Sequence, residues 1–249
     1  MKRFHLFEFH DWRWFPWRGY LTDLLTYQIV ADAFYAPVYP LLKQALAATG
    51  HTHIVDLGSG SGGALGQLAD WLSAHNYPVT VTLTDLFPPS NPSIAAPLSY
   101  HPFAVDARHV PDDLTGFRTF FTVFHHFRSA DAAAILQDAV DKGKPIAIFE
   151  FTERRWSNLL GMLLSPIAVW LQTWQIQPRQ PGRLFWTYII PIVPFIYWWD
   201  GTVSHLRTYT PDELRAMTDS TGSNYNWNIG KLATESGNIT YLLGWQMSG

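Results

Sequence analysis

The chain has 249 residues, which suits one large domain or one domain with a sizeable insertion. Its formal net charge of −3 argues against nucleic acid or another polyanion as the partner. The absence of cysteine excludes disulfides, thiolate metal ligands and a cysteine nucleophile, whereas 12 Trp and 16 Phe indicate apolar contacts beyond an ordinary core.

The N-terminal segment lacks the apolar core of a signal peptide, because Glu8, His10 and Asp11 interrupt it. The residues that follow it have apolar side chains at helical spacing. Pro37 and Pro40 predict a break in this helical region.

Short strand-like runs alternate with helical runs from His53 onward. Strands are expected at "THIVDL", "PVTVTLTDLFP", "FAVDAR", "RTFFTVFHHF" and "KPIAIFEF", and helices at "ALGQLADWLSAH", "SADAAAILQDAVDKG" and "DELRAMTDSTG". A terminal hairpin is expected at "NYNWNIGKLA" and "ITYLLGWQM". Strands separated by helices predict a parallel sheet with right-handed crossovers.

The most specific motif is the glycine-rich turn "VDLGSGSGG" after the first of these strands. Gly58, Gly60 and Gly63 satisfy the dinucleotide fingerprint G-x-G-x-x-G, and Asp85 follows about twenty residues later. Asp56 precedes the first glycine, where its carboxylate would repel a pyrophosphate above the turn. The motif therefore suits a ligand with an ammonium group and no phosphate.

From about His53 to Phe151 these elements resemble those of the class I S-adenosylmethionine-dependent methyltransferases. The resemblance implies a Rossmann-like fold with a seven-stranded, mostly parallel sheet, an antiparallel seventh strand and S-adenosyl-L-methionine as cofactor. It further implies that Asp85 binds the ribose hydroxyls and that Asp106 lies near the adenine amino group. The implied cofactor-binding residues are Asp56, Gly58, Ser59, Gly60, Gly62, Asp85, Leu86, Asp106, Ala107 and Phe124. A turn or a helix cap is the alternative role for Asp106, and a cap for Asp85.

The resemblance also implies one domain in three parts. Residues 1–50 would form an N-terminal helical lid segment. Residues 51–155 and 201–249 would form the Rossmann-like core, and residues 156–200 an aromatic-rich helical insertion that builds the substrate pocket. The segments "WFPW", "TDLL" and "WDGTVSHLRTY" are similar to segments of uncharacterised bacterial members of the family. This similarity does not identify a substrate.

The end of the fourth strand faces the methyl group and the acceptor in this family, which here is "FHHF". Methyl transfer requires mainly that the acceptor is aligned within about 3–3.5 Å and that water is excluded, and an oxygen acceptor also needs a base. His125, His126 and His205 are the candidate catalytic bases, with pocket-filling or packing histidines as the alternative. Because consecutive strand residues point to opposite faces, His125 and His126 are expected on different sides of the sheet.

Glu150 and Glu153 are further candidates at the exit of the fifth strand, or only part of a solvated, ion-paired turn. They do not reproduce the carboxylate cluster of metal-dependent catechol methyltransferases, and no H-x-x-H spacing occurs. No metal is therefore expected.

Two apolar runs, residues 156–174 and 184–199, flank the linker "QIQPRQPGR". As a helix the second run would span only about 24 Å, short of the roughly 30 Å hydrocarbon core, and Pro191 and Pro194 interrupt it. Walls of an apolar pocket are therefore favoured over a membrane hairpin, with a surface that docks on a membrane or a dimer partner as the alternative. The candidate substrate-binding residues are Trp14, Tyr20, Trp186, Tyr188, Trp198 and Arg207.

The sequence thus predicts an S-adenosylmethionine-dependent methyltransferase that acts on a small apolar acceptor, either aromatic or lipid-like. A cytoplasmic monomer or homodimer without a nucleic-acid partner is expected, with peripheral membrane contact as an option. One alternative is a cofactor-binding scaffold of the same fold without turnover. Another is an NAD-dependent oxidoreductase, which Asp56 and the lack of a second nucleotide-binding half disfavour.

Overall fold

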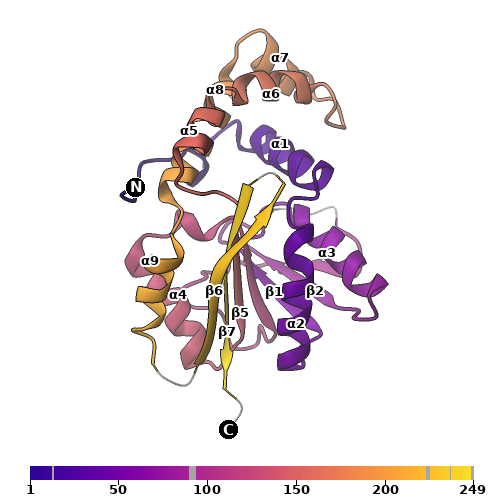
Figure 1. The fold of residues 1–249 in the computed structure, drawn as a ribbon. Helices are drawn as coiled ribbons and strands as arrows, with labels where there is room; N and C mark the ends of the chain where they lie inside the picture. Colours follow the sequence, from indigo (N-terminus) through magenta and orange to yellow (C-terminus); the bar gives the residue numbers. More distant parts are fainter. Residues whose placement is uncertain (13, 90–93, 223–224, 236, 248–249) are drawn as a thin grey trace.

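A seven-stranded sheet forms the centre of the structure, a computed structural model that describes residues 1–12, 14–89, 94–222, 225–235 and 237–247 (Figure 1). The strand order is β3-β2-β1-β4-β5-β7-β6. β7 pairs antiparallel with β5 and β6, and the other neighbours pair in parallel. The strands are β1 (His53–Leu57), β2 (Thr80–Thr84), β3 (Leu98–Tyr100), β4 (Phe117–Phe121), β5 (Ile146–Glu150), β6 (Tyr225–Thr234) and β7 (Gly237–Gln246). The predicted mostly parallel sheet with an antiparallel seventh strand is confirmed.

Helices cover both faces of this sheet because successive strand residues point to opposite sides. On one face, α2 (Tyr39–Thr49) and α3 (Gly63–Ala74) pack with residues such as Ile54 of β1. On the other face, α4 (Ser129–Asp141) and α9 (Pro211–Thr218) pack with its neighbour Val55. The interior strand β5 is buried along its whole length, as expected for an apolar strand between two helical layers.

A third apolar cluster lies apart from the sheet and joins the N-terminal region to the insertion. It combines Phe15, Leu21 and Leu24 with residues of the insertion such as Val169 and Val193. Figure 1 shows the insertion helices stacked above α1, at the end of the molecule away from the C terminus. The helices concerned are α1 (Arg18–Ala31), α5 (Trp156–Met162), α6 (Ser165–Thr173), α7 (Pro181–Tyr188) and α8 (Ile192–Arg207). Three short 3-10 helices complete the described part of the chain: η1 (Phe9–Asp11), η2 (Ala36–Val38) and η3 (Phe124–His126).

Two local predictions were wrong. The third strand is Leu98–Tyr100, and the expected strand "FAVDAR" forms a turn instead. β4 ends at Phe121, so His125 and His126 lie on the 3-10 helix η3 and not on a strand. The expected alternation of the two histidines across the sheet therefore does not apply.

The apolar run 184–199 is divided between two helices. α7 ends at Tyr188, and α8 begins at Ile192 and continues to Arg207. Pro194 lies in the first turn of α8, where a missing backbone donor costs little. Within the described residues, no helix is both long and apolar enough to cross a membrane.

Two leucine substitutions should separate the core from the insertion surface. Leu42 is fully buried in the core, whereas Leu160 is 63% exposed on α5. We expect Leu42→Ala to lower the free energy of unfolding by about 2–5 kcal/mol because it leaves a cavity, and Leu160→Ala to change it by less than about 0.5 kcal/mol. Urea unfolding at constant m-value measures both, and equal losses would contradict this division.

Candidate functional site

The glycine-rich turn connects β1 to α3 at the carboxyl end of the parallel strands. Gly58, Gly60 and Gly62 have φ values of 72°, 53° and 75°, a region that non-glycine residues rarely adopt. A Cβ at Gly58 would lie 2.9 Å from the Val123 side chain, whereas a Cβ at Gly60 would meet nothing within 4 Å. The turn is therefore closely packed at its start and open at Gly60.

The aspartate that ends the second strand is tied directly to this turn. Asp85 Oδ2 accepts a hydrogen bond from the backbone N–H of Gly60 at 3.0 Å, and its Oδ1 accepts one from Phe87 at 2.8 Å. Each carboxylate oxygen keeps a further lone pair for a ligand hydroxyl. Its neighbour Leu86 is exposed. The structure thus brings Asp85 and the glycine turn together, as the sequence predicts.

Asp56 lies beneath the turn and is only 2% exposed. Its Oδ1 accepts a hydrogen bond from Thr119 Oγ1 at 2.6 Å, and its backbone carbonyl accepts one from Ser59 Oγ at 3.0 Å. Burial raises the pKa of Asp56 to about 7, although the hydrogen bonds from Thr119 and Ser59 act in the opposite direction. Asp56 therefore fixes the turn from below, while burial disfavours its charged form.

The segment after β3 reaches the same edge through its backbone. Val105 N–H donates to the carbonyl of Asp85 at 2.9 Å, and the following Ala107 is buried. Asp106 accepts hydrogen bonds from Arg108, which hold the pKa of its carboxyl below the ordinary value. The adenine contact of Asp106 stays a prediction, since its carboxylate is paired with Arg108 here.

The end of β4 carries a buried histidine–carboxylate pair. His125 is 2% exposed, and Glu150 at the end of β5 accepts hydrogen bonds from its backbone N–H at 3.1 Å and from its Nδ1 at 2.8 Å. A carboxylate on Nδ1 places the lone pair of the neutral ring on Nε2. This Nε2 is buried and has no hydrogen-bond partner among the described residues. It is the group at this edge that is free to accept a proton.

The other two candidate bases have protein partners. His126 Nδ1 lies 2.8 Å from Asp11 Oδ1 and 3.5 Å from Glu8 Oε2. His205 Nδ1 lies 3.0 Å from both the backbone nitrogen and the carbonyl oxygen of Glu153. Burial lowers the pKa of His205 to about 4, so its ring is neutral near pH 7 and a weak base.

Glu153 itself is engaged by basic and amide partners. Lys231 forms an ion pair with its Oε1, and Asn238 donates to its Oε2 at 3.1 Å. Burial alone would raise the pKa of Glu153, but these two hydrogen bonds outweigh it and lower the value. Glu153 is therefore a structural acid rather than a proton acceptor.

A charged cluster that sequence reasoning did not identify joins the N-terminal segment to α8 and η3. Arg207 is 1% exposed and lies 3.3 Å from Glu8 Oε1 and 2.6 Å from Asp11 Oδ2. Burial raises the pKa of Glu8 to about 7, although His126 and Arg207 act to lower it. For Asp11, hydrogen bonds from His126 and Arg207 outweigh burial and hold the pKa below its ordinary value. No local sequence motif predicts these contacts, because Asp11 and Arg207 are 196 residues apart in the chain.

The same region contains donor atoms that a cation could use. Within the described residues, ligand atoms of Glu8, His125 and His126 lie within 4.8 Å of one another. Arg207 places a guanidinium 3.3 Å from Glu8, and its positive charge opposes a second cation there. The expectation of no metal remains a prediction.

Of the aromatic residues expected to bind substrate, two lie in the cluster between α1 and the insertion, two make contacts within the insertion, and Trp14 is exposed. Tyr20 and Trp186 are part of the cluster between α1 and the insertion, where Trp186 stacks edge-on against Trp17 with ring centroids 5.4 Å apart. Tyr188 donates to the carbonyl of Trp170 at 2.8 Å, and Trp198 packs against Phe195. Trp14 is 74% exposed. The sixth candidate, Arg207, is engaged in the ion pairs described above.

Phe124 is placed in the core. It has no exposed surface and packs against Phe120 and Tyr209 on the α4 side of the sheet. Above the glycine turn, α1 takes the covering position: Thr26 Oγ1 of α1 lies 2.6 Å from Ser61 Oγ. Two open cavities, of about 360 and 440 Å³, lie elsewhere, around Arg155 and around Ala133. Neither cavity includes the glycine turn. The candidate site there is defined by the backbone geometry of the turn and by its hydrogen bond to Asp85.

The fold is similar to that of solved methyltransferases. The plantazolicin methyltransferase BpumL in complex with SAH has a TM-score of 0.60 at 10% identity, over 96% of this chain and 94% of that chain. BamL, crystallised with a triazolic desmethylPZN analog and SAH, has a TM-score of 0.55 at 10% identity and the same coverage. No protein-family model and no curated protein matches the sequence. The chain therefore has the class I methyltransferase fold.

The buried acids should make stability depend on pH. Glu8 has a folded pKa of about 7 and a reference value of 4.5, so the folded state binds more protons between these values. The free energy of unfolding should fall by roughly 3 kcal/mol from this group as pH rises from about 4.5 to 7.

Glu8→Gln should therefore flatten the decline in stability, measured by urea unfolding at several pH values between about 4.5 and 7.5. The Glu8→Gln variant should retain part of the pH dependence of stability, because burial also raises the pKa of Asp56. Glu235→Gln is the control, since Glu235 is exposed. A slope that Glu8→Gln leaves unchanged would contradict the assignment.

Proposed function

We propose that this protein is an S-adenosylmethionine-dependent methyltransferase that acts on a small apolar acceptor. The observation that carries the proposal is the arrangement at the carboxyl edge of the sheet. There the open glycine turn, Asp85 and the His125–Glu150 pair follow β1, β2, β4 and β5. BpumL and BamL, which share the fold, were crystallised with SAH, the demethylated form of this cofactor.

The residues of the turn fit this cofactor. Gly60 leaves space for a ligand beside the backbone, and Asp85 has carboxylate lone pairs that can accept from both ribose hydroxyls. A positively charged ligand above the turn would favour the ionised form of Asp56, whose pKa burial otherwise raises to about 7. S-adenosylmethionine would supply an activated methyl group.

His125 is the base that we assign for an acceptor with a hydroxyl group. Glu150 orients the ring through Nδ1, stabilises the imidazolium that forms, and leaves Nε2 to take the proton. Because Nε2 is buried and α8 packs against η3, the acceptor must enter with a movement of the covering elements. Closure of these elements would also exclude water.

The residues that cover the site support an apolar acceptor. α1 lies on the glycine turn, and α1 in turn packs against the insertion through Trp17, Tyr20 and Trp186. The insertion has no Asp or Glu from Trp156 to Trp199. Such walls bind aromatic or aliphatic groups and offer few partners to a charged substrate.

A cofactor-binding protein without turnover is the second candidate. The burial of His125 Nε2 favours it, because no acceptor can reach this atom without movement. An NAD-dependent oxidoreductase is less compatible with the fold, because the antiparallel β7 stands where a second nucleotide-binding half would continue the parallel sheet.

Cofactor binding can be measured by titration calorimetry with SAH, with NAD as the contrasting ligand. Asp85→Ala should weaken SAH binding about 10- to 100-fold, because it removes charge-assisted bonds to the ribose. Asp70→Ala is the matched control, since Asp70 is exposed on α3. Heat from NAD but none from SAH would reject the cofactor, and equal affinity in Asp85→Ala would reject the role of Asp85.

The base can be identified with labelled S-adenosylmethionine and a panel of phenols. For a phenol that is methylated, His125→Gln should lower kcat about 10²–10⁴-fold without changing SAH affinity. His205→Gln should have a much smaller effect, because its pKa of about 4 makes it a poor base. A larger loss in His205→Gln would reverse the assignment. Tight SAH binding without transfer to phenols, quinones or lipid extracts would favour the non-catalytic candidate.

A further inference from the structure

The outer side of α5 and α6 carries a continuous stripe of exposed apolar side chains. Its members lie on α5, on α6 and in the turns that join and follow these helices, and most are three or four residues apart. More than half of the surface of each is exposed. They are Trp156, Leu160, Leu163, Leu164, Ile167, Trp170, Leu171 and Trp174, here called the apolar face. Ile189, 70% exposed after α7, and Phe195 on α8 are further exposed apolar residues of the insertion.

Two insertion helices, α6 and α7, bury polar side chains and expose large apolar ones, whereas α8 buries apolar residues such as Val193 and Ile196. α6 turns Ser165, Val169 and Thr173 inward and leaves Ile167 and Trp170 outside. The buried Ser165 hydroxyl has no hydrogen-bond partner among the described residues. α7 likewise buries Arg183 and Thr187 and exposes Phe185. A soluble helix places its apolar stripe inward, so this pattern indicates that something covers the outer side.

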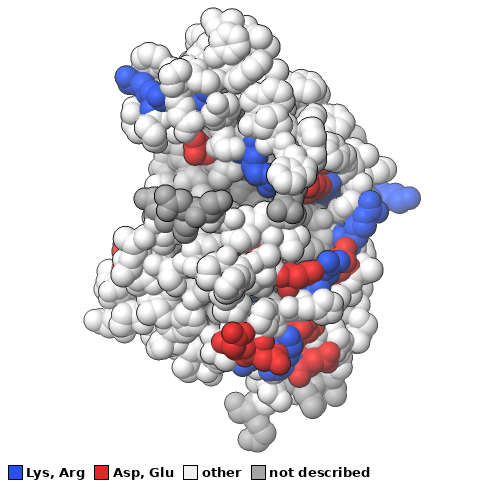
Figure 2. All heavy atoms as spheres, turned by 180° about the vertical axis from the view of Figure 1, so that it is seen from behind, with Lys and Arg blue, Asp and Glu red and all other residues white. Residues whose placement is uncertain are grey.

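The charges bordering the apolar face are basic. No Asp or Glu occurs between Trp156 and Trp199. Arg183 is buried against Asp23, whereas Arg179 is exposed and Arg155 is exposed with its guanidinium 3.7 Å from Glu153 Oε2. Arg179 lies over the ring of Trp174, 4.5 Å from its centroid. Figure 2 shows this end of the molecule, at the top, almost entirely uncharged, with basic atoms at its edge.

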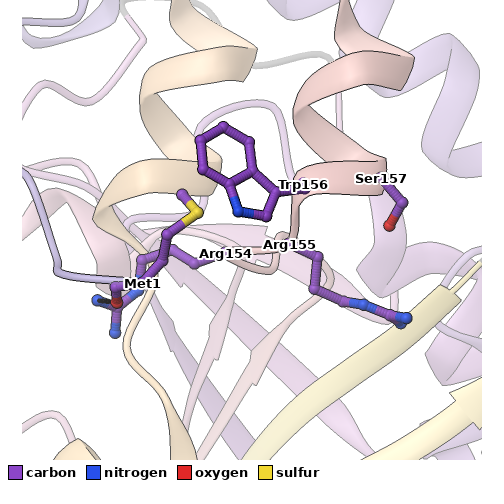
Figure 3. Close-up of a pocket in the computed structure, with 5 residues that line it drawn as sticks. All are labelled: Met1, Arg154, Arg155, Trp156 and Ser157. Atoms are coloured by element: carbon purple, nitrogen blue, oxygen red, sulfur yellow. Dashed lines mark hydrogen bonds between the residues drawn. The ribbon is translucent and has the colours of Figure 1, made fainter.

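A basic cavity adjoins the first residue of the face. It has a volume of about 360 Å³ and is lined by Met1, Arg154, Arg155, Trp156 and Ser157. In Figure 3 the side chains of Arg154 and Arg155 extend to opposite sides of Trp156. Arg154 is bound to Glu213 and to the carbonyl of Met1, whereas the side chain of Arg155 is 54% exposed. Guanidinium and hydroxyl groups without a lining carboxylate suit an anionic headgroup.

We propose that the apolar face docks this protein on the surface of a lipid bilayer that contains anionic lipids. The apolar side chains would enter the boundary between headgroups and acyl chains, where Trp rings are favoured, while Arg155 and Arg179 contact the headgroups. A second copy of the chain fits less well, because it would bring the same acid-free face and no carboxylate for Arg179. The proposal concerns a surface and holds whether or not the protein transfers methyl groups.

The full-length protein can be tested by co-sedimentation with vesicles of phosphatidylcholine alone or with about 30% phosphatidylserine, in low and high salt. We expect binding to the anionic vesicles, weakened by salt, and a blue shift of Trp fluorescence. The variant Leu163→Gln/Ile167→Gln/Leu171→Gln should bind at least about tenfold more weakly, because three exposed side chains no longer enter the bilayer.

Two further variants keep the result interpretable. Arg155→Glu/Arg179→Glu should lose the preference for anionic vesicles without altering the apolar face. Phe103→Gln is the matched control, since Phe103 is 72% exposed outside the insertion, and it should bind like the wild type. Thermal unfolding checks that all variants are folded. No vesicle binding by the wild type, or equal binding by the triple variant, would overturn the proposal. The proposal would also be overturned if sedimentation velocity showed that the wild type is a dimer and that, among the variants, only the triple variant is monomeric.

Discussion

The buried ion pairs of Arg207 hold the upper half of the molecule in place. Arg207 ends α8, yet its guanidinium binds Glu8 and Asp11 of the N-terminal segment, and Asp11 in turn binds His126 on η3. One side chain thereby joins the chain start, the insertion and the end of β4. Removing one partner of such a buried pair typically costs about 3–5 kcal/mol, because the other charge is left uncompensated.

The cover above the sheet is built as a second layer with a core of its own. Phe15, Leu21 and Leu24 meet Val169 and Val193 there, so the insertion contacts the sheet mainly through α1 and through the C-terminal half of α8. Access to the proposed base, His125, would require this layer to move relative to the sheet, because the base is covered in the structure.

The insertion combines two surfaces that differ in role. Its inner side packs on α1 and carries Arg183 bound to Asp23, while its outer side carries the apolar face. A bilayer against the outer side would place the covering layer between the lipid and the glycine turn. An apolar acceptor that is dissolved in the bilayer would then have a short path to the site, which agrees with the proposed substrate class.

The sequence by itself determined the glycine turn after β1, the position of Asp85 after β2 and the terminal hairpin, because these depend on local patterns. It mistook the third strand and the setting of His125 and His126, because β-prone residues also form turns where the sheet has ended. Only the tertiary structure decided that Glu8 and Asp11 reach Arg207, and that the insertion helices turn Ser165 and Thr173 inward. Helical periodicity shows that two sides differ, but which side is covered depends on residues distant in the chain.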